Sequence, residues 1–173
     1  MSFRRNETVE VCQKQAAGFM ADGCYLQATF MATIGGTHCL VQYQTRYSDD
    51  SKKTLKSEVV HADVVRPVPP SPSNRTDYSV SQKVDAYDGG AWWVGRISAV
   101  EGDSDAPEFT VRLDATGNRF KFPFFRLRNH LDWRGGEWVQ PAPSRAYVIR
   151  LPLSCRLDFY FVVVCRFLVF IFF

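Results

Sequence analysis

The sequence repeats one succession of strand-like segments on either side of a proline-rich stretch, PVPPSPSN at residues 67–74. Four short segments precede it and four follow it, in the same order and about 60 to 75 residues apart: residues 7–12, 23–30, 38–43 and 62–67, then 82–87, 90–97, 108–113 and 124–129. The repeat matches Val9 with Val84, Tyr25 with Trp92, Ala28 with Gly95, Phe30 with Ile97, Val41 with Val111, and Arg66 with Arg128. A repeat of this length indicates a duplicated small domain, because solenoid units are shorter.

Each repeated segment has the pattern of a β-strand. The segments are short, alternate in polarity and are rich in Val, Phe, Tyr, Trp and Thr. Turn residues separate them, and we expect the polar stretch at 51–60 to be a loop with at most one helical turn. Four or five short strands in about 60 residues, without a long helix, predict a small closed barrel. We therefore predict an all-β chain with one module at 1–67, a Pro-rich linker at 68–77 and a second module at 78–140.

The net charge of +3 comes from the end of the chain. Residues 144–173 hold four arginines against one aspartate, so residues 1–143 carry 17 basic and 17 acidic side chains. A protein that binds nucleic acid through its phosphates usually has a clustered basic excess. The balance of charge in the predicted modules therefore argues against that class, except for local contacts.

The cysteines and histidines do not form a recognisable metal or catalytic motif. The five cysteines contain no C-x-x-C pair, and none of the three histidines flanks them at metal-ligand spacing. No nucleophile motif or phosphate-binding loop is present. The first residues, MSFRRNETVE, lack the apolar stretch of a signal peptide. We expect reduced cysteines, no metal, no cofactor and no enzymatic activity.

Residues 141–173 depart from the repeat and form a hydrophobic tail. Its apolar runs, Phe159–Cys165 and Phe167–Phe173, are separated by Arg166. A membrane-spanning helix needs about 20 mostly apolar residues, and Phe159 to the end supplies 15 with a charge in the middle. We expect the tail to lie outside the folded modules, and we do not expect it to insert into a membrane. The translation of a T-rich intron and a membrane anchor stay open as explanations of it.

With the repeat laid out, the chain resembles plant Agenet-domain proteins that carry paired Agenet modules. In the first module the likeness is carried by VEVCQKQAAGFMADGCYLQATF, VQY and EVVHADVVRPVPP. In the second module it is carried by KVDAYDGGAWWVGRI, FTVRL and FRLRNHLDWRGGEWV. The most specific part is the ending L-R-x-H-x-D-W-x-x-G-x-W, at Leu127–Trp138. The resemblance covers roughly residues 3–140 and stops at Pro141.

The resemblance implies two SH3-like barrels of the Tudor-like Royal superfamily, without catalysis or a cofactor. It also implies a nuclear protein associated with chromatin, since some paired plant Agenet proteins bind methylated lysine on histone tails. Other members are linked to RNA or to protein partners, which leaves two alternatives open. One is an RNA- or DNA-binding module, for which Arg119, Lys121, Arg126 and Arg128 form a local basic cluster. The other is an interaction scaffold for other nuclear proteins.

A methyl-lysine site is a box of aromatic faces, often with one carboxylate, because ring quadrupoles attract the methylated ammonium. In Royal barrels this box lies at one end, near the first-strand turn. In the first module the candidate walls are Phe19, Tyr25, Tyr43 and Tyr47, with Asp49 or Asp50 as the carboxylate. The alternative is that two or three of these aromatics only pack the barrel.

In the second module the corresponding candidates are Tyr87, Trp92 and Phe120, with Asp85 or Asp88 nearby. The doublet at 92–93 should split, because neighbouring side chains of a strand point to opposite faces. Trp93 matches Leu26 and is expected in the core, while Trp92 matches Tyr25 and is expected outside. Leu113 stands where the first module has Tyr43, so the second cage lacks one wall. We expect Trp133 and Trp138 to cover a barrel or the seam between the modules.

Overall fold

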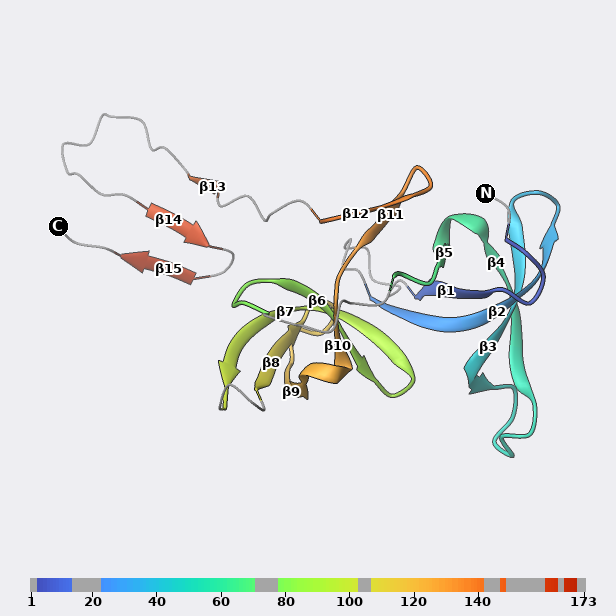
Figure 1. Cartoon of the computed structure of the whole chain (residues 1–173), viewed down its shortest axis with the longest axis horizontal. Coiled ribbons are helices and arrows are strands. Elements are labelled where there is room, and N and C mark those ends of the chain that lie inside the picture. Colours follow the sequence, from blue (N-terminus) through green and yellow to red (C-terminus); the bar gives the residue numbers. More distant parts are fainter. Residues whose placement is uncertain are drawn as a thin grey trace. The chain divides into compact units, whose positions relative to one another are not determined.

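The computed structural model describes residues 3–13, 23–70, 78–102 and 107–141, together with the backbone of three short strands beyond them. The chain divides into two compact units, Met1–Pro141 and Ala142–Phe173. The first unit is built around a ten-stranded sheet system, and no α-helix occurs in the described residues (Figure 1). The predicted all-β fold is confirmed.

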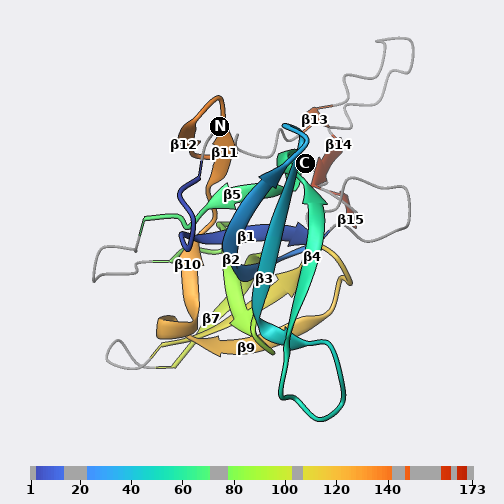
Figure 2. The same cartoon turned by 90° about the vertical axis from the view of Figure 1, so that its right-hand side faces the viewer.

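Five strands make the first barrel. β1 (Thr8–Gln13) pairs with β2 (Cys24–Ile34) and with β5 (Val65–Pro67). β3 (His38–Tyr47) pairs with β2 and with β4 (Leu55–His61), and the 3₁₀ turn η1 (Ala62–Val64) leads from β4 into β5 (Figure 2). Alternate residues of these strands fill the core, which contains Val9, Val11, Leu26, Ala28, Phe30, Cys39, Val41, Tyr43 and Val65.

The second barrel repeats the first strand by strand. β6 (Lys83–Asp88), β7 (Ala91–Glu101), β8 (Glu108–Leu113), β9 (Arg119–Pro123), η2 (Phe124–Arg126) and β10 (Leu127–Asn129) follow in the same order. β10 pairs with β6 as β5 pairs with β1. The bulge recurs as well: the register shifts between Phe30 and Ala32 in the first barrel and between Ile97 and Ala99 in the second. The repeat found in the sequence is therefore a repeat of the structure.

The expectation of a loop at 51–60 was wrong, because β4 begins at Leu55 within it. Among the described strands β4 pairs only with β3, which makes it an edge strand. An edge strand keeps polar side chains such as Ser57 and His61 in solvent, which hides the apolar alternation that marks a half-buried strand. Here pairing with a neighbouring strand decided the structure, and local composition did not.

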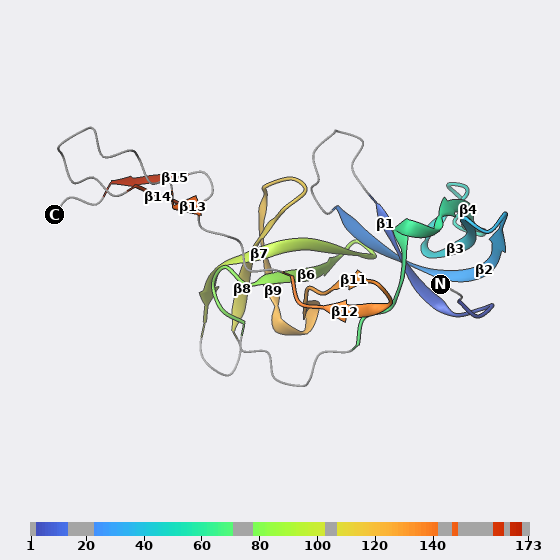
Figure 3. The same ribbon diagram turned by 90° about the horizontal axis from the view of Figure 1, so that it is seen from above.

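A two-stranded hairpin follows the second barrel. It is made of β11 (Asp132–Arg134) and β12 (Glu137–Val139) (Figure 3). These strands place Trp133 directly opposite Trp138, with ring centroids 5.0 Å apart. The turn between them is Gly135-Gly136, whose positive φ angles of 61° and 90° suit glycine. The hairpin therefore presents a cross-strand tryptophan pair as one unit.

The second unit contains three described strands: β13 (Tyr147–Val148), β14 (Phe161–Val164) and β15 (Phe167–Phe170), paired antiparallel. Most of the predicted tail lies outside the described residues. Within the described part of the chain, no helix has the length and apolarity needed to cross a membrane.

Candidate functional site

The two barrels are joined by direct strand pairing. β2 pairs with β7 through Cys24 opposite Trp93, Tyr25 opposite Trp92 and Leu26 opposite Ala91. The sequence repeat equates Tyr25 with Trp92, so this central pair lies on an approximate two-fold axis that exchanges the modules. Trp93 packs against the cores of both barrels. The seam is therefore a continuous part of the sheet.

Four buried charges meet beside this axis, two from each module. Glu10 of β1 and Arg66 of β5 correspond to Asp85 of β6 and Arg128 of β10. Arg66 donates from Nε and Nη2 to Oε2 of Glu10 at 3.0 and 2.8 Å. Arg128 donates to Oδ2 of Asp85 at 3.0 Å and to both carboxylate oxygens of Glu10 at 2.7 and 3.0 Å. The two carboxylates and two guanidiniums balance, which makes their burial tolerable.

The two buried arginines also stack on the aromatic residues of the axis. The Arg66 guanidinium carbon lies 3.2 Å from the Tyr25 ring centroid and 5.2 Å from that of Trp138. The Arg128 guanidinium carbon lies 4.1 Å from the Trp92 ring centroid. Arg66 further donates to the carbonyl of Leu131 at 2.9 Å, next to the tryptophan hairpin. Tyr25 and Trp92, predicted as ligand walls, thus each have an arginine of this chain over a ring face.

His130 extends the buried network. Its Nδ1 lies 2.5 Å from Oδ1 of Asp85, and its Nε2 lies 3.3 Å from Oδ1 of Asp132. Asp132 in turn accepts from Arg134 at 2.8 Å. The motif residues His130 and Asp132 therefore connect the second barrel to its hairpin through polar contacts.

The prediction for the outer face of β7 was incomplete. Trp93, expected in the core, is partly buried and packs against the cores of both barrels. Val94, which alternation puts on the same side of the strand as Trp92, is fully buried. Val94 donates its N–H to the carbonyl of Gly23 at 3.4 Å, so the first module covers it. Both faces of β7 are covered at the seam.

The open end of the first barrel lies where β3 separates from β2. Tyr43 is the last residue of β3 to pair with β2, opposite Ala28, and its side chain is fully buried. Its hydroxyl donates to Oε2 of Glu58 at 2.9 Å and accepts from Nε2 of Gln13 at 3.1 Å. The exposed Arg46 holds its guanidinium carbon 5.7 Å from the Tyr43 ring centroid. This ring already attracts a cation.

The other first-module candidates lie around or beyond this end. Tyr47, the last residue of β3, is 42% exposed and pairs with Leu55 after an irregular stretch of the ladder. Asp49 and Asp50 are exposed in the following turn, where Asp49 accepts from the Ser51 hydroxyl at 2.7 Å. Phe19 lies outside the described residues.

The second module differs at the equivalent end. Leu113 pairs with Gly95 as Tyr43 pairs with Ala28, so the module has an apolar side chain where the first has a phenol. Tyr87 and Trp92 have ring centroids 5.0 Å apart, and Asp88 follows Tyr87. Phe120 is exposed on β9, and no ring contact joins it to that pair. The structure brings together two of the three predicted aromatics.

Glu58 and Gln13 were not among the residues predicted for the site. Glu58 was hidden in the stretch expected to be a loop, and its role depends on β4 pairing with β3. Gln13 ends β1, and only its contact with Tyr43 marks it. An acidic residue in an otherwise strand-compatible stretch after β3 was the only available signal.

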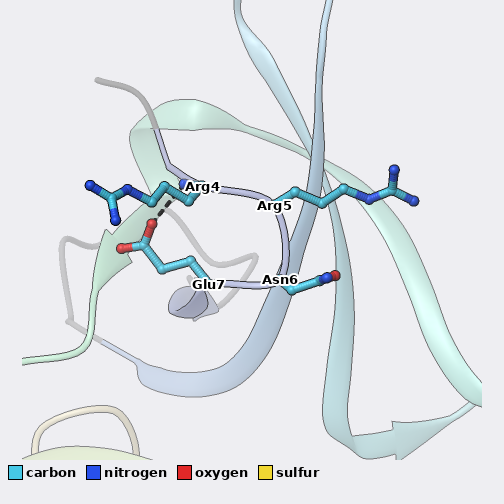
Figure 4. Close-up of a pocket in the computed structure, with 4 residues that line it drawn as sticks. All are labelled: Arg4, Arg5, Asn6 and Glu7. Carbon is cyan, nitrogen blue, oxygen red and sulfur yellow. Dashed lines mark hydrogen bonds between the residues drawn. The ribbon is translucent and has the colours of Figure 1, made fainter.

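A hollow at the start of the chain offers no convergent site. It is lined by Arg4, Arg5, Asn6 and Glu7, and the two arginine side chains extend in opposite directions (Figure 4). The Glu7 carboxylate already accepts a hydrogen bond from the nearby Arg4 backbone N–H at 2.7 Å. Among the described residues no group of three or more His, Cys, Asp or Glu side chains could hold a metal ion.

Burial raises the pKa of Tyr43 from 10 to about 12, and its hydrogen bond to Glu58 acts in the same direction. A raised pKa means that the folded state holds this proton more tightly, so the contribution is complete below about pH 10 and is lost as pH rises towards 12. Urea unfolding of the chain and of Tyr43→Phe, from about pH 8 to 11.5, tests this. The phenylalanine variant should lose less stability over that interval, and parallel losses would contradict the assignment.

Two small antiparallel barrels, joined by the pairing of β2 with β7 and carrying aromatic and acidic side chains at one barrel end, define a class: a Tudor-like binding module. The comparisons with known proteins agree with this class.

Residues 6–70 match the model of the Agenet domain. The chain is 30% identical over 158 residues to Protein AGENET DOMAIN (AGD)-CONTAINING P1 of Arabidopsis thaliana, covering 89% of this chain and 28% of that protein. It is 28% identical over 146 residues to DUF724 domain-containing protein 3 of Arabidopsis thaliana, covering 82% and 20%. The chain thus spans only a fifth to little more than a quarter of these relatives.

Two solved structures have the same fold. The crystal structure of ADCP1 tandem Agenet domain 3-4 has a TM-score of 0.69 at 24% identity, covering 81% of this chain and 89% of that one. Arabidopsis thaliana AGDP1 AGD34 has a TM-score of 0.69 at 25% identity, covering 80% and 90%. The chain is a plant Agenet-domain protein with two tandem Tudor-like barrels. Agenet domains are interaction modules and not enzymes.

Proposed function

We propose that this protein binds peptides that carry methylated lysine, most naturally a histone tail, at the open end of its first barrel. The observation that carries the proposal is the arrangement at Tyr43. The ring has a cation, Arg46, over it, while its hydroxyl is tied to the carboxylate of Glu58. The exposed ring of Tyr47 ends the same strand.

The chemistry of this end suits a methylated ammonium. Methylation keeps the positive charge of lysine but removes N–H donors and adds apolar bulk, so ring faces bind it better than hydrogen-bond acceptors alone. Glu58 retains 40% exposure of its side chain and has Lys56 Nζ at 3.5 Å. A partly exposed carboxylate beside aromatic rings attracts a cation without the cost of a fully buried charge.

In this proposal the ligand takes the place of Arg46 over the Tyr43 ring. Arg46 is exposed, so its side chain can turn into solvent. Tyr47 supplies a second wall, and Glu58 with Asp49 or Asp50 supplies negative charge. Phe19 remains a candidate wall, because its segment starts at Gln13, which donates to the Tyr43 hydroxyl.

We assign Tyr25 and Trp92 a different role. Each stacks under a buried arginine at the seam, so a ligand cation would have to displace a guanidinium that also holds a buried carboxylate. Tyr87, Phe120 and Asp88 remain candidates for a separate site in the second module. The first-barrel end is favoured because Leu113 replaces the phenol in the second.

Calorimetric titration of the full chain with matched lysine peptides, unmethylated to trimethylated, tests the proposal. We expect a clear preference for methylated peptide, and Tyr47→Ala should weaken that binding by at least about tenfold, the effect of losing one cation–π wall. Tyr47→Phe keeps the ring and should keep most of the affinity. Val59→Ala, an exposed change on the adjacent strand, is the matched control and should have no effect.

Equal affinity for methylated and unmethylated peptide would refute the methyl-lysine proposal. The nucleic-acid alternative has little support from the surface: Arg128 is buried in the seam network, and Lys121 lies 2.6 Å from Glu101. Binding of RNA that weakens steeply with salt would favour it. A histone ligand implies nuclear localisation, which fluorescence microscopy of the tagged full chain would test.

A further inference from the structure

The proposed ligand site lies where the second module meets the first. β1 occupies one edge of β2 along Cys24–Thr29, so β3 and β7 share the other edge. β3 pairs there only as far as Ala28, opposite Tyr43, and β7 pairs there from Leu26 to Cys24. β7 therefore takes the place that β3 leaves, and the turn before β7 lies beside the end of β3.

A direct contact confirms this placement. The hydroxyl of Thr45 donates to the carbonyl of Gly90 at 3.1 Å. The approach is so close that a Cβ on Gly90 would lie 2.8 Å from the Thr45 Cβ. Thr45 is two residues from Tyr43 and two from Tyr47, which is about 7 Å along an extended chain. The turn at 88–90 therefore borders the proposed site.

The turn is held in place from both sides. Trp93 packs against the core of the first barrel, and its Nε1 donates to the Asp88 carbonyl at 3.2 Å. Gly89 and Gly90 have φ angles of 57° and 80°, which glycine adopts without strain. The position of the turn relative to β3 is therefore fixed by the strand pairing and the tryptophan together.

Asp88 brings a negative charge to this border. Its side chain is 65% exposed, and the nearest cation, Nη1 of Arg126, is 3.9 Å away. A carboxylate that is exposed and only loosely paired can still act on an incoming cation.

We propose that the Asp88–Gly90 turn forms one wall of the methyl-lysine site of the first module, and that Asp88 helps select the cationic peptide. This inference rests on the proposed function and makes the site a property of the tandem pair. Gly90 provides the close approach to Thr45, and Asp88 adds negative charge to that of Glu58. A peptide with a further basic residue next to the methylated lysine would gain most from Asp88.

Calorimetry with a trimethyl-lysine peptide tests the wall. In the full chain, Asp88→Asn should weaken binding roughly three- to tenfold, the effect of removing one partly screened charge near the ligand. Glu137→Gln removes the same charge from an exposed side chain on β12 and should leave affinity unchanged. Arg126→Gln frees Asp88 from its partner and should strengthen binding, a gain that a merely structural role of Asp88 would not produce.

The possible results distinguish a failure of the Asp88–Gly90 wall from a failure of the methyl-lysine proposal. If Tyr47→Ala abolishes a methyl-dependent affinity while Asp88→Asn behaves like Glu137→Gln, the wall is overturned and the methyl-lysine proposal stands. If the unmodified chain shows no methyl preference, both are overturned. Urea unfolding of each variant shows whether a lost affinity reflects a lost fold.

Discussion

Replacing Arg66 by methionine should lower the free energy of unfolding by about 3–5 kcal/mol, the usual cost of leaving a buried charge without its partner. Arg66 is one of two cations that neutralise Glu10 and Asp85, and all four groups are buried. Its loss leaves one net negative charge at the seam and removes the cation over Tyr25. Urea unfolding followed by tryptophan fluorescence would measure the change.

A second variant shows whether charge is the cause. Glu10→Gln combined with Arg66→Met leaves Asp85 balanced by Arg128 and should recover part of the loss. Lys121→Met removes an exposed partner of Glu101 and should hardly change the unfolding curve, because exposed ion pairs contribute little. If Arg66→Met and Lys121→Met behaved alike, the seam network would not stabilise the fold.

Replacing Tyr25 by alanine should act on stability rather than on the ligand. The side chain is buried at the seam and stacked 3.2 Å from the Arg66 guanidinium carbon. Removing a buried aromatic ring costs about 3–5 kcal/mol in typical cores, and here it also uncovers a buried cation. We expect a large loss in the free energy of unfolding, with peptide affinity of the remaining folded protein retained.

Tyr47 provides the opposite case. Tyr47→Ala should lose binding with little change in unfolding, because Tyr47 is partly exposed at the end of β3. Tyr25→Phe keeps the ring over Arg66 and should keep most of the stability. If the Tyr25→Ala protein kept its free energy of unfolding but no longer bound methylated peptide, Tyr25 would belong to the ligand site.

The fold was predictable because its signals are local and occur twice. Alternation of polarity, turn residues and a matched order of segments predicted two all-β modules, and the shared bulge after Phe30 and Ile97 shows that the match extends to backbone detail. β4 escaped prediction because an edge strand can be polar on its exposed positions. β4 forms because it pairs with β3, and the residues of β4 by themselves do not indicate that pairing.

The candidate site was only partly predictable. Alternation correctly placed Tyr25 and Trp92 on the face opposite the core, but being outside one barrel did not mean facing solvent. The pairing of β2 with β7 covers that face and places arginines from β5 and β10 over both rings. Glu58, Gln13 and the 88–90 turn reach the end of the first barrel only through contacts between distant parts of the chain.

The sequence by itself determined most strands of the two barrels, the duplication and the family, because these depend on residue periodicity and on motifs such as Leu127–Trp138. Only the tertiary structure decided which aromatics are covered at the seam between the modules and which stay exposed. The reason is that the burial of a side chain depends on which other part of the chain packs against it, and local sequence does not specify that part. Tyr25 and Trp92 face each other across the axis of the pair, whereas Tyr47 stands where β3 no longer pairs with β2.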